Sequence, residues 1–137
     1  MTRNRGMAVG VAALGVLLVA LATPVRAHHS RAMFAGDKTI TLEGTMTEIA
    51  WANPHSLFFV NAKPLDQPSA PASSWSVEGP RPRELTNMGW ERDTIKVGDK
   101  VRITGHPRKD GKSQILFIEL SDDKGHHFVE KAEEGGD

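Results

Sequence analysis

The chain has no cysteine and no tyrosine, and only 6% of its 137 residues are aromatic. The absence of cysteine excludes disulfides, zinc–thiolate sites, cysteine nucleophiles, thioether-linked haem and a lipoprotein anchor. Neither sign of charge is in excess, with 17 basic and 17 acidic residues. Proteins that bind the phosphate backbone of a nucleic acid use clustered Lys and Arg, so we expect no nucleic-acid partner.

The longest apolar segment lies at the start of the chain. Arg3 and Arg5 precede an apolar run over residues 7–22, and Ala27 follows shortly after. A basic region, an apolar run and small residues before the cut are typical of a secretory signal peptide, so we predict that residues 1–27 are removed. The run is shorter than the roughly 18 residues of a membrane-spanning helix, and we expect no stable membrane anchor after cleavage. The protein is then periplasmic or secreted.

The remaining chain has the length of one domain. Removal of the signal peptide takes three arginines and no acidic residue, which leaves 14 basic and 17 acidic residues. We predict one folded domain over residues 28–123. A polar C-terminal tail is expected over residues 124–137, where Phe128 offers an anchor to the domain.

Short segments with the alternation of β-strands dominate this domain. In the first, over residues 39–46, the alternation slips by one residue beside Gly44, which indicates a bulged and bent strand. Pro82 and Gly89 bound a short helical segment. Further strands are expected at 57–60, 75–78, 97–105 and 115–120, with a hairpin turn at 109–111.

This order of three strands, a short helix and two strands is that of the OB-fold. We therefore predict an all-β protein, a small five-stranded OB-like barrel with one short helix between the third and fourth strands. An immunoglobulin-like sandwich would need about seven strands, and the chain offers five.

All six histidines follow the expected cleavage site, and His28 and His29 would open the mature chain. An N-terminal histidine can chelate a metal ion through its α-amine and its imidazole together, which no internal histidine can do. A nitrogen-rich set without cysteine favours Cu(II), the ion at the top of the stability order. His55 is the candidate third imidazole, on condition that the N-terminal arm lies across the barrel there. The competing interpretation, in which His28 and His29 are exposed polar residues, stays open.

The tryptophans offer a second functional interpretation. OB-folds bind ligands on the surface around the second and third strands, so Trp51, Phe58 and Trp75 are candidates for an aromatic binding face. The simpler interpretation places these rings in the core and at the rim of a small barrel.

We expect no enzyme and therefore no catalytic residue. The sequence has no Gly-rich phosphate loop and no dinucleotide fingerprint. The Ser residues that follow His29 and His55 do not form a nucleophile–base pair through adjacency alone. No cofactor other than copper is indicated.

Several short motifs stand out, namely Ala27-His-His-Ser30, Leu42-Glu-Gly-Thr45, Trp51-Ala-Asn-Pro-His55, Trp75-Ser-Val-Glu78, Gly89-Trp90 and Gly98-Asp99. They resemble those of a family of small secreted bacterial proteins known only as domain of unknown function 6152. The resemblance covers nearly all of the mature chain and implies export and a small β-domain, but no activity, because the family is uncharacterised. A looser similarity, in strand order and in the Gly-Asp-Lys-Val segment at 98–101, is to periplasmic OB-fold proteins.

Together these observations predict an exported binding protein that binds Cu(II) without turnover through His28, His29 and His55. The alternative is a β-barrel interaction module that binds a protein or a small anionic ligand through its aromatic face.

Overall fold

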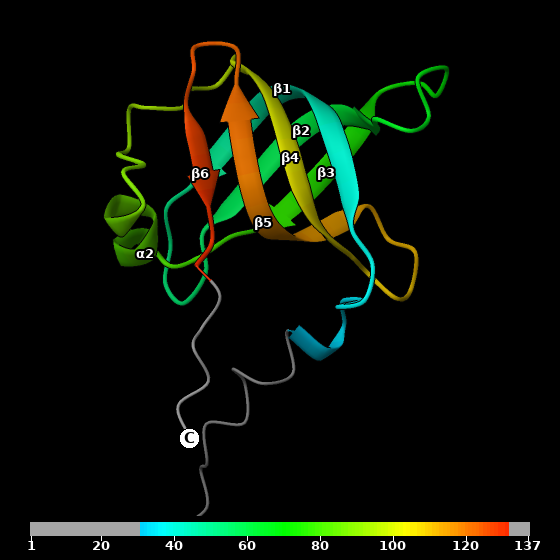
Figure 1. Cartoon of the computed structure of the whole chain (residues 1–137), viewed down its shortest axis with the longest axis horizontal. Helices are drawn as coiled ribbons and strands as arrows, with labels where there is room; N and C mark the ends of the chain where they lie inside the picture. Colours follow the sequence, from blue (N-terminus) through cyan, green and yellow to red (C-terminus); the bar gives the residue numbers. More distant parts are fainter. Residues whose placement is uncertain (1–30, 132–137) are drawn as a thin grey trace, which may run out of the picture.

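The computed structural model describes residues 31–131. The expected signal peptide, His28 and His29 lie outside this range. Within it, no helix is long and apolar enough to cross a membrane. Figure 1 shows the elements, which are β1 (Ile40–Ala50), β2 (Leu57–Pro64), β3 (Ser73–Glu78), α2 (Pro82–Asn87), β4 (Lys100–Pro107), β5 (Gln114–Asp122) and β6 (His127–Val129).

The sheet closes into a barrel because β3 pairs with both β2 and β5. Its strands follow the order β3-β2-β1-β4-β5-β6, and the β3–β5 pairing, which is parallel, joins the two halves. The helix α2 lies between β3 and β4 in the chain. The predicted fold class, a five-stranded OB-like barrel with one short helix, is thus confirmed.

The long strand β1 pairs with β2 on one side and with β4 on the other. Its register with β2 shifts between Met46 and Glu48, close to the irregularity expected beside Gly44. Gly44 has a different role, because a Cβ there would overlap the carbonyl oxygen of Asn61 and lie 2.5 Å from the Cα of Ala62. The glycine lets the two strands approach closely, and the bulge that bends β1 follows it.

The core is centred on Trp90, which follows α2 and is fully buried. Gly89, with φ of 88°, takes the left-handed conformation that turns the chain after the helix. The Trp90 ring stacks on Phe58 from β2 and on Phe128 from β6, with centroids 4.7 and 5.3 Å apart. Aromatic rings bury a large apolar area, so this stack connects three distant segments of the chain.

Part of the segment expected to be a polar tail is folded. Residues 127–129 form β6, which pairs antiparallel with β5. Phe128 is only 6% exposed and provides the expected anchor. A strand of three residues with one apolar side chain has no periodicity to detect, which explains why it was not predicted.

Candidate functional site

His55 lies in the turn between β1 and β2, which the backbone ties to the end of β3. The N–H of Ser56 donates to the carbonyl of Pro80 (3.1 Å), and the N–H of Gly79 donates to the carbonyl of Ser56 (2.8 Å). Gly79 is needed for this approach, because a Cβ there would lie 2.6 Å from the ring of Phe58. These contacts hold His55, which precedes Ser56, beside Glu78, which precedes Gly79.

As a result, an imidazole and a carboxylate converge at this point. His55 Nε2 lies 3.8 Å from Glu78 Oε1, and the two side chains are 36% and 13% exposed. Imidazole nitrogen and carboxylate oxygen are both common ligands of divalent transition metals. The pair therefore has the donor types of a metal site, although two donors alone do not complete one.

The N-terminal arm, residues 31–38, lies against the hairpin between β4 and β5. The N–H of Ala35 donates to the carbonyl of Pro107 (2.8 Å). Phe34 pairs with Arg108 through an isolated β-bridge and is only 3% exposed. Burial of an aromatic ring supplies most of the energy of such a contact, so Phe34 fastens the arm to the barrel.

The start of the described arm is held as well. Arg31 Nη2 lies 3.2 Å from Glu130 Oε1, in an ion pair with the residue that follows β6. In Figure 1 the arm, the β4–β5 hairpin and the turn between β1 and β2 all lie at the lower end of the barrel. The chain therefore enters the fold at the end that carries His55.

Arg108 connects the arm with the Glu78 side of the barrel. Its guanidinium donates to both carboxylate oxygens of Asp110 (2.8 and 2.6 Å) and to Oε1 of Gln114 (3.0 Å). The hydrogen bonds to Asp110 raise the pKa of Arg108, and the charge of Glu78 adds a smaller increase. Arg108 in turn holds the pKa of the Asp110 carboxyl far below its usual range. The Glu78 carboxylate therefore lies close enough to Arg108, with which the arm pairs, to affect its pKa.

The aromatic residues proposed as a binding face do not form one surface. Phe58 is fully buried and belongs to the core, which corrects its placement on an accessible face. It points inward because the side chains of a strand alternate and its neighbour Val60 also faces the core. Trp75 packs partly buried against the core, and its Nε1 is buried without a hydrogen-bond partner among residues 31–131. Trp51 is half-buried, with the guanidinium of Arg92 5.3 Å from its ring centroid.

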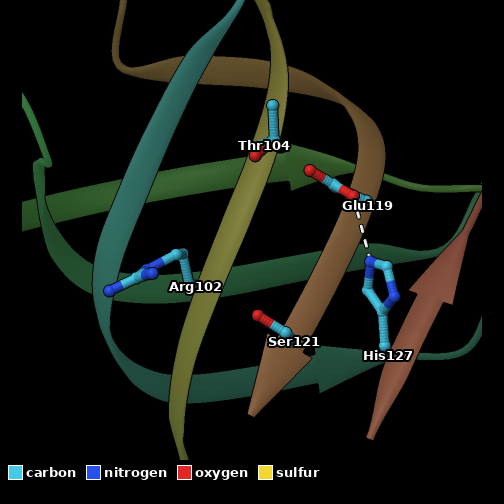
Figure 2. Close-up of a pocket in the computed structure, with 5 residues that line it drawn as sticks. All are labelled: Arg102, Thr104, Glu119, Ser121 and His127. Atoms are coloured by element: carbon cyan, nitrogen blue, oxygen red, sulfur yellow. Dashed lines mark hydrogen bonds and ion pairs between the residues drawn. The ribbon is translucent and has the colours of Figure 1, made fainter.

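A shallow depression of about 270 Å³ lies on a different face of the barrel, over β4, β5 and β6. Figure 2 shows His127 directed at Glu119, and their Nε2 and Oε2 atoms are 3.0 Å apart. These side chains are 59% and 41% exposed. The lining combines two hydroxyl side chains with three longer ionisable ones, namely Arg102, Thr104, Glu119, Ser121 and His127.

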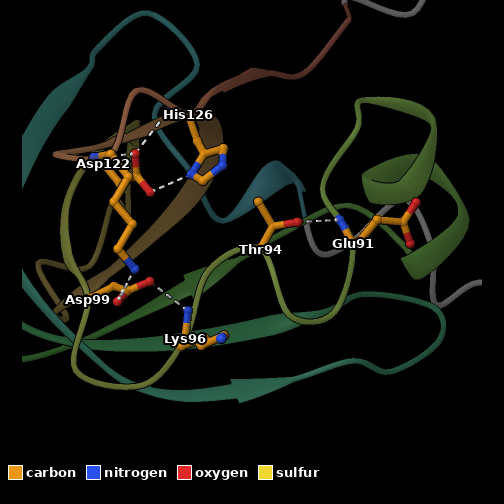
Figure 3. Close-up of polar contacts among 7 residues, drawn as sticks. Glu91, Thr94, Lys96, Asp99, Asp122 and His126 are labelled. Carbon is orange, nitrogen blue, oxygen red and sulfur yellow. Dashed lines mark hydrogen bonds and ion pairs between the residues drawn. The ribbon is translucent and has the colours of Figure 1, made fainter.

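His126, in the segment expected to be a polar tail, takes part in a polar cluster at the turn between β5 and β6 (Figure 3). Its Nδ1 lies 2.7 Å from Oδ2 of Asp122, whose side chain is fully buried. Lys124 Nζ donates to Oδ1 of Asp99 (2.8 Å), which joins the turn to the start of β4. The polar groups of this cluster are paired with one another, and they stabilise the turn.

No group of three or more His, Cys, Asp or Glu side chains suited to a metal ion occurs among residues 31–131. His55 is therefore the one predicted ligand in the described range, and the structure places it beside Glu78. Sequence reasoning missed Glu78, although a signal was present. In an antiparallel pair of consecutive strands, the start of the first lies opposite the end of the second, which places Glu78 near His55.

The model of the family described as "Family of unknown function (DUF6152)" matches residues 14–117. No curated protein matches the chain significantly. Among solved structures, the mitochondrial single-stranded DNA-binding protein Rim1 of S. cerevisiae aligns with 65% of this chain and 97% of its own, with a TM-score of 0.46 and 9% identity. The assignment of the OB-like fold rests on the strand pairing described above.

Proposed function

Since the chain belongs to DUF6152, a family of unknown function, we propose its role from its own geometry: it is an exported, non-catalytic module that binds Cu(II). The ligands are the α-amine and imidazole of His28, the imidazole of His29 and the imidazole of His55. The observation that carries the proposal is the seat of the N-terminal arm at the end of the barrel where His55 lies.

Strand spacing gives the distance that the arm has to cover. Leu116 of β5 pairs with Glu78 of β3 on one side and with His106 of β4 on the other. Neighbouring strands are about 4.8 Å apart, so the His55–Glu78 pair lies roughly 10 Å from the strand that leads to Arg108. The arm meets this strand at Phe34, and residues 28–30, beyond Arg31, add up to about 11 Å of reach when extended. This length supports a site shared by the arm and the barrel.

The donor count also favours a shared site. The barrel supplies too few ligands on its own, because residues 31–131 contain no three-ligand group. An N-terminal histidine adds an amine and an imidazole from one residue, and a divalent copper ion prefers such nitrogen donors in a tetragonal arrangement. Neither part alone completes the coordination, and together they do.

The test is a Cu(II) titration of mature protein that begins at His28, compared with the same protein carrying one additional N-terminal Ala. We expect one equivalent to bind to the authentic protein with a nitrogen-rich electron paramagnetic resonance spectrum. The additional Ala moves the α-amine away from the imidazole of His28, so the affinity falls at least about tenfold.

Equal affinity of the two proteins would contradict the proposal, since the chelate at His28 would then contribute nothing. Thermal unfolding of both proteins without metal provides the control for the fold.

A further inference from the structure

We propose that Glu78 is a ligand of the same copper site and supplies its oxygen donor. This inference rests on the proposed function, and it adds a residue of the barrel to the ligands named above. The site then consists of the α-amine and imidazole of His28, the imidazoles of His29 and His55, and one carboxylate oxygen of Glu78.

The distance between the two donors fits a bridging metal ion. Metal–nitrogen and metal–oxygen bonds are about 2.0–2.2 Å long, so two ligands of one ion lie at most about 4.3 Å apart. His55 Nε2 and Glu78 Oε1 are 3.8 Å apart, close to the roughly 4.2 Å between opposite ligands of a square arrangement, so a small side-chain adjustment lets both bind one ion. At 3.8 Å the two atoms are too far apart to be hydrogen-bonded to each other.

The second His–Glu pair of the barrel differs in the distance between its donor atoms and in the exposure of its side chains. His127 and Glu119 are in hydrogen-bond contact at 3.0 Å, and both side chains are more exposed than their counterparts in the His55–Glu78 pair. That pair lies on the outer face over β5 and β6, and Arg102 lines the same depression. The two pairs have the same chemistry and different geometry, which makes His127 and Glu119 a matched control.

The positive charge of Arg108 does not exclude a cation beside Glu78. Two of its hydrogen bonds go to the carboxylate of Asp110, and this ion pair balances the guanidinium. Glu78 itself is 13% exposed and sits at the end of β3, where the bonds between Ser56 and the Gly79-Pro80 segment fix the backbone. A fixed carboxylate is the kind of ligand that raises affinity, because little freedom is lost when the metal binds.

The experiment measures Cu(II) affinity by competition, together with the paramagnetic resonance spectrum, in Glu78→Gln, Glu78→Asp and the control Glu119→Gln. All variants begin at His28. We expect Glu78→Gln to bind at least about tenfold more weakly and to show an altered spectrum. Glu78→Asp keeps the charge but withdraws the oxygen by one carbon, so it also loses affinity, whereas Glu119→Gln binds as the wild type does.

Wild-type affinity and an unchanged spectrum in Glu78→Gln would overturn the role of Glu78 and leave the proposed function standing. Wild-type affinity in Glu78→Asp with a loss in Glu78→Gln would also overturn it, since the carboxylate would then act through its charge alone. Equal binding by the authentic and Ala-extended proteins would instead remove the proposed function, and the ligand role of Glu78 with it.

Discussion

Two glycines show at the scale of single residues how close backbone contacts shape the molecule. Gly44 lets β1 approach β2, and Gly79 lets the end of β3 approach the ring of Phe58. Gly79 shapes the site directly, because it follows Glu78 in the chain and its N–H donates to the carbonyl of Ser56, the residue after His55. The contact that it allows places His55 beside the carboxylate.

We predict that Gly44→Ala destabilises the domain by about 1–3 kcal/mol, because the added methyl group overlaps backbone atoms that cannot move aside cheaply. For a domain of this size, the thermal unfolding midpoint should fall by roughly 5–20 °C. Gly36→Ala is the matched control, since a Cβ there meets nothing within 4 Å. Similar midpoints for the two variants would show that the close approach of β1 and β2 is not tight.

The histidines show which contacts can be predicted from one sequence alone. His55 was identified because it follows Asn53-Pro54 in a turn, which is a local signal. Glu78 lies 23 positions further along the chain, and only the pairing of β2 with β3 brings it to His55. The contact of His126 with Asp122 was not predicted, because Asp122 is an ordinary polar residue in the sequence and its burial is seen only in the folded structure.

At the scale of elements, a polar cluster joins the turn between β5 and β6 to the start of β4. Burial by itself raises the pKa of Asp122, but the hydrogen bonds from the side chain and backbone of His126 and from the N–H of Lys124 lower it further than burial raises it. The hydrogen bond from Lys124 lowers the pKa of Asp99, with a smaller contribution from the N–H of Lys96. Both carboxylates are therefore stabilised in their charged forms in the folded protein.

We predict from these shifts that the cluster contributes stability above about pH 4, the usual range of an unfolded Asp. The contribution is lost as the pH falls from there through the lower pKa values of the folded state. Asp122→Asn should lower the free energy of unfolding at pH 7 and flatten its decline below pH 4, as measured by urea unfolding between pH 7 and pH 2.5. Asp123→Asn, an exposed neighbour in the same turn, is the control. An equally steep decline in Asp122→Asn and the wild type would contradict this account.

The elements also show how far periodicity predicts this fold. The five barrel strands and α2 were recognised because each carries alternating or bounded apolar residues over several positions. The strand β6 was missed because it is three residues long, and it is held by one side chain, Phe128, that stacks on the distant Trp90. The order of elements was sufficient for the OB-like barrel because few topologies join three strands, a helix and two strands.

At the scale of the whole molecule, the barrel holds the N-terminal arm, residues 31–38, against one end of its sheet. Phe34 and Arg31 fix the arm at two points, on the β4–β5 hairpin and after β6. Export is part of the proposed function, because cleavage after Ala27 would create the free amine of His28. In this account the fold serves to bring His55 and Glu78 to a chelating terminus.

The central claim is that the barrel adds its own ligands to those of the N-terminus. The most direct test compares the Cu(II) affinity of the mature domain with that of a synthetic peptide of residues 28–38, which has the same free N-terminus but no barrel. The account predicts that the domain binds at least about tenfold more tightly, because His55 and Glu78 complete the coordination. Equal affinities of peptide and domain would contradict it, since the copper would then be bound by the N-terminal residues alone.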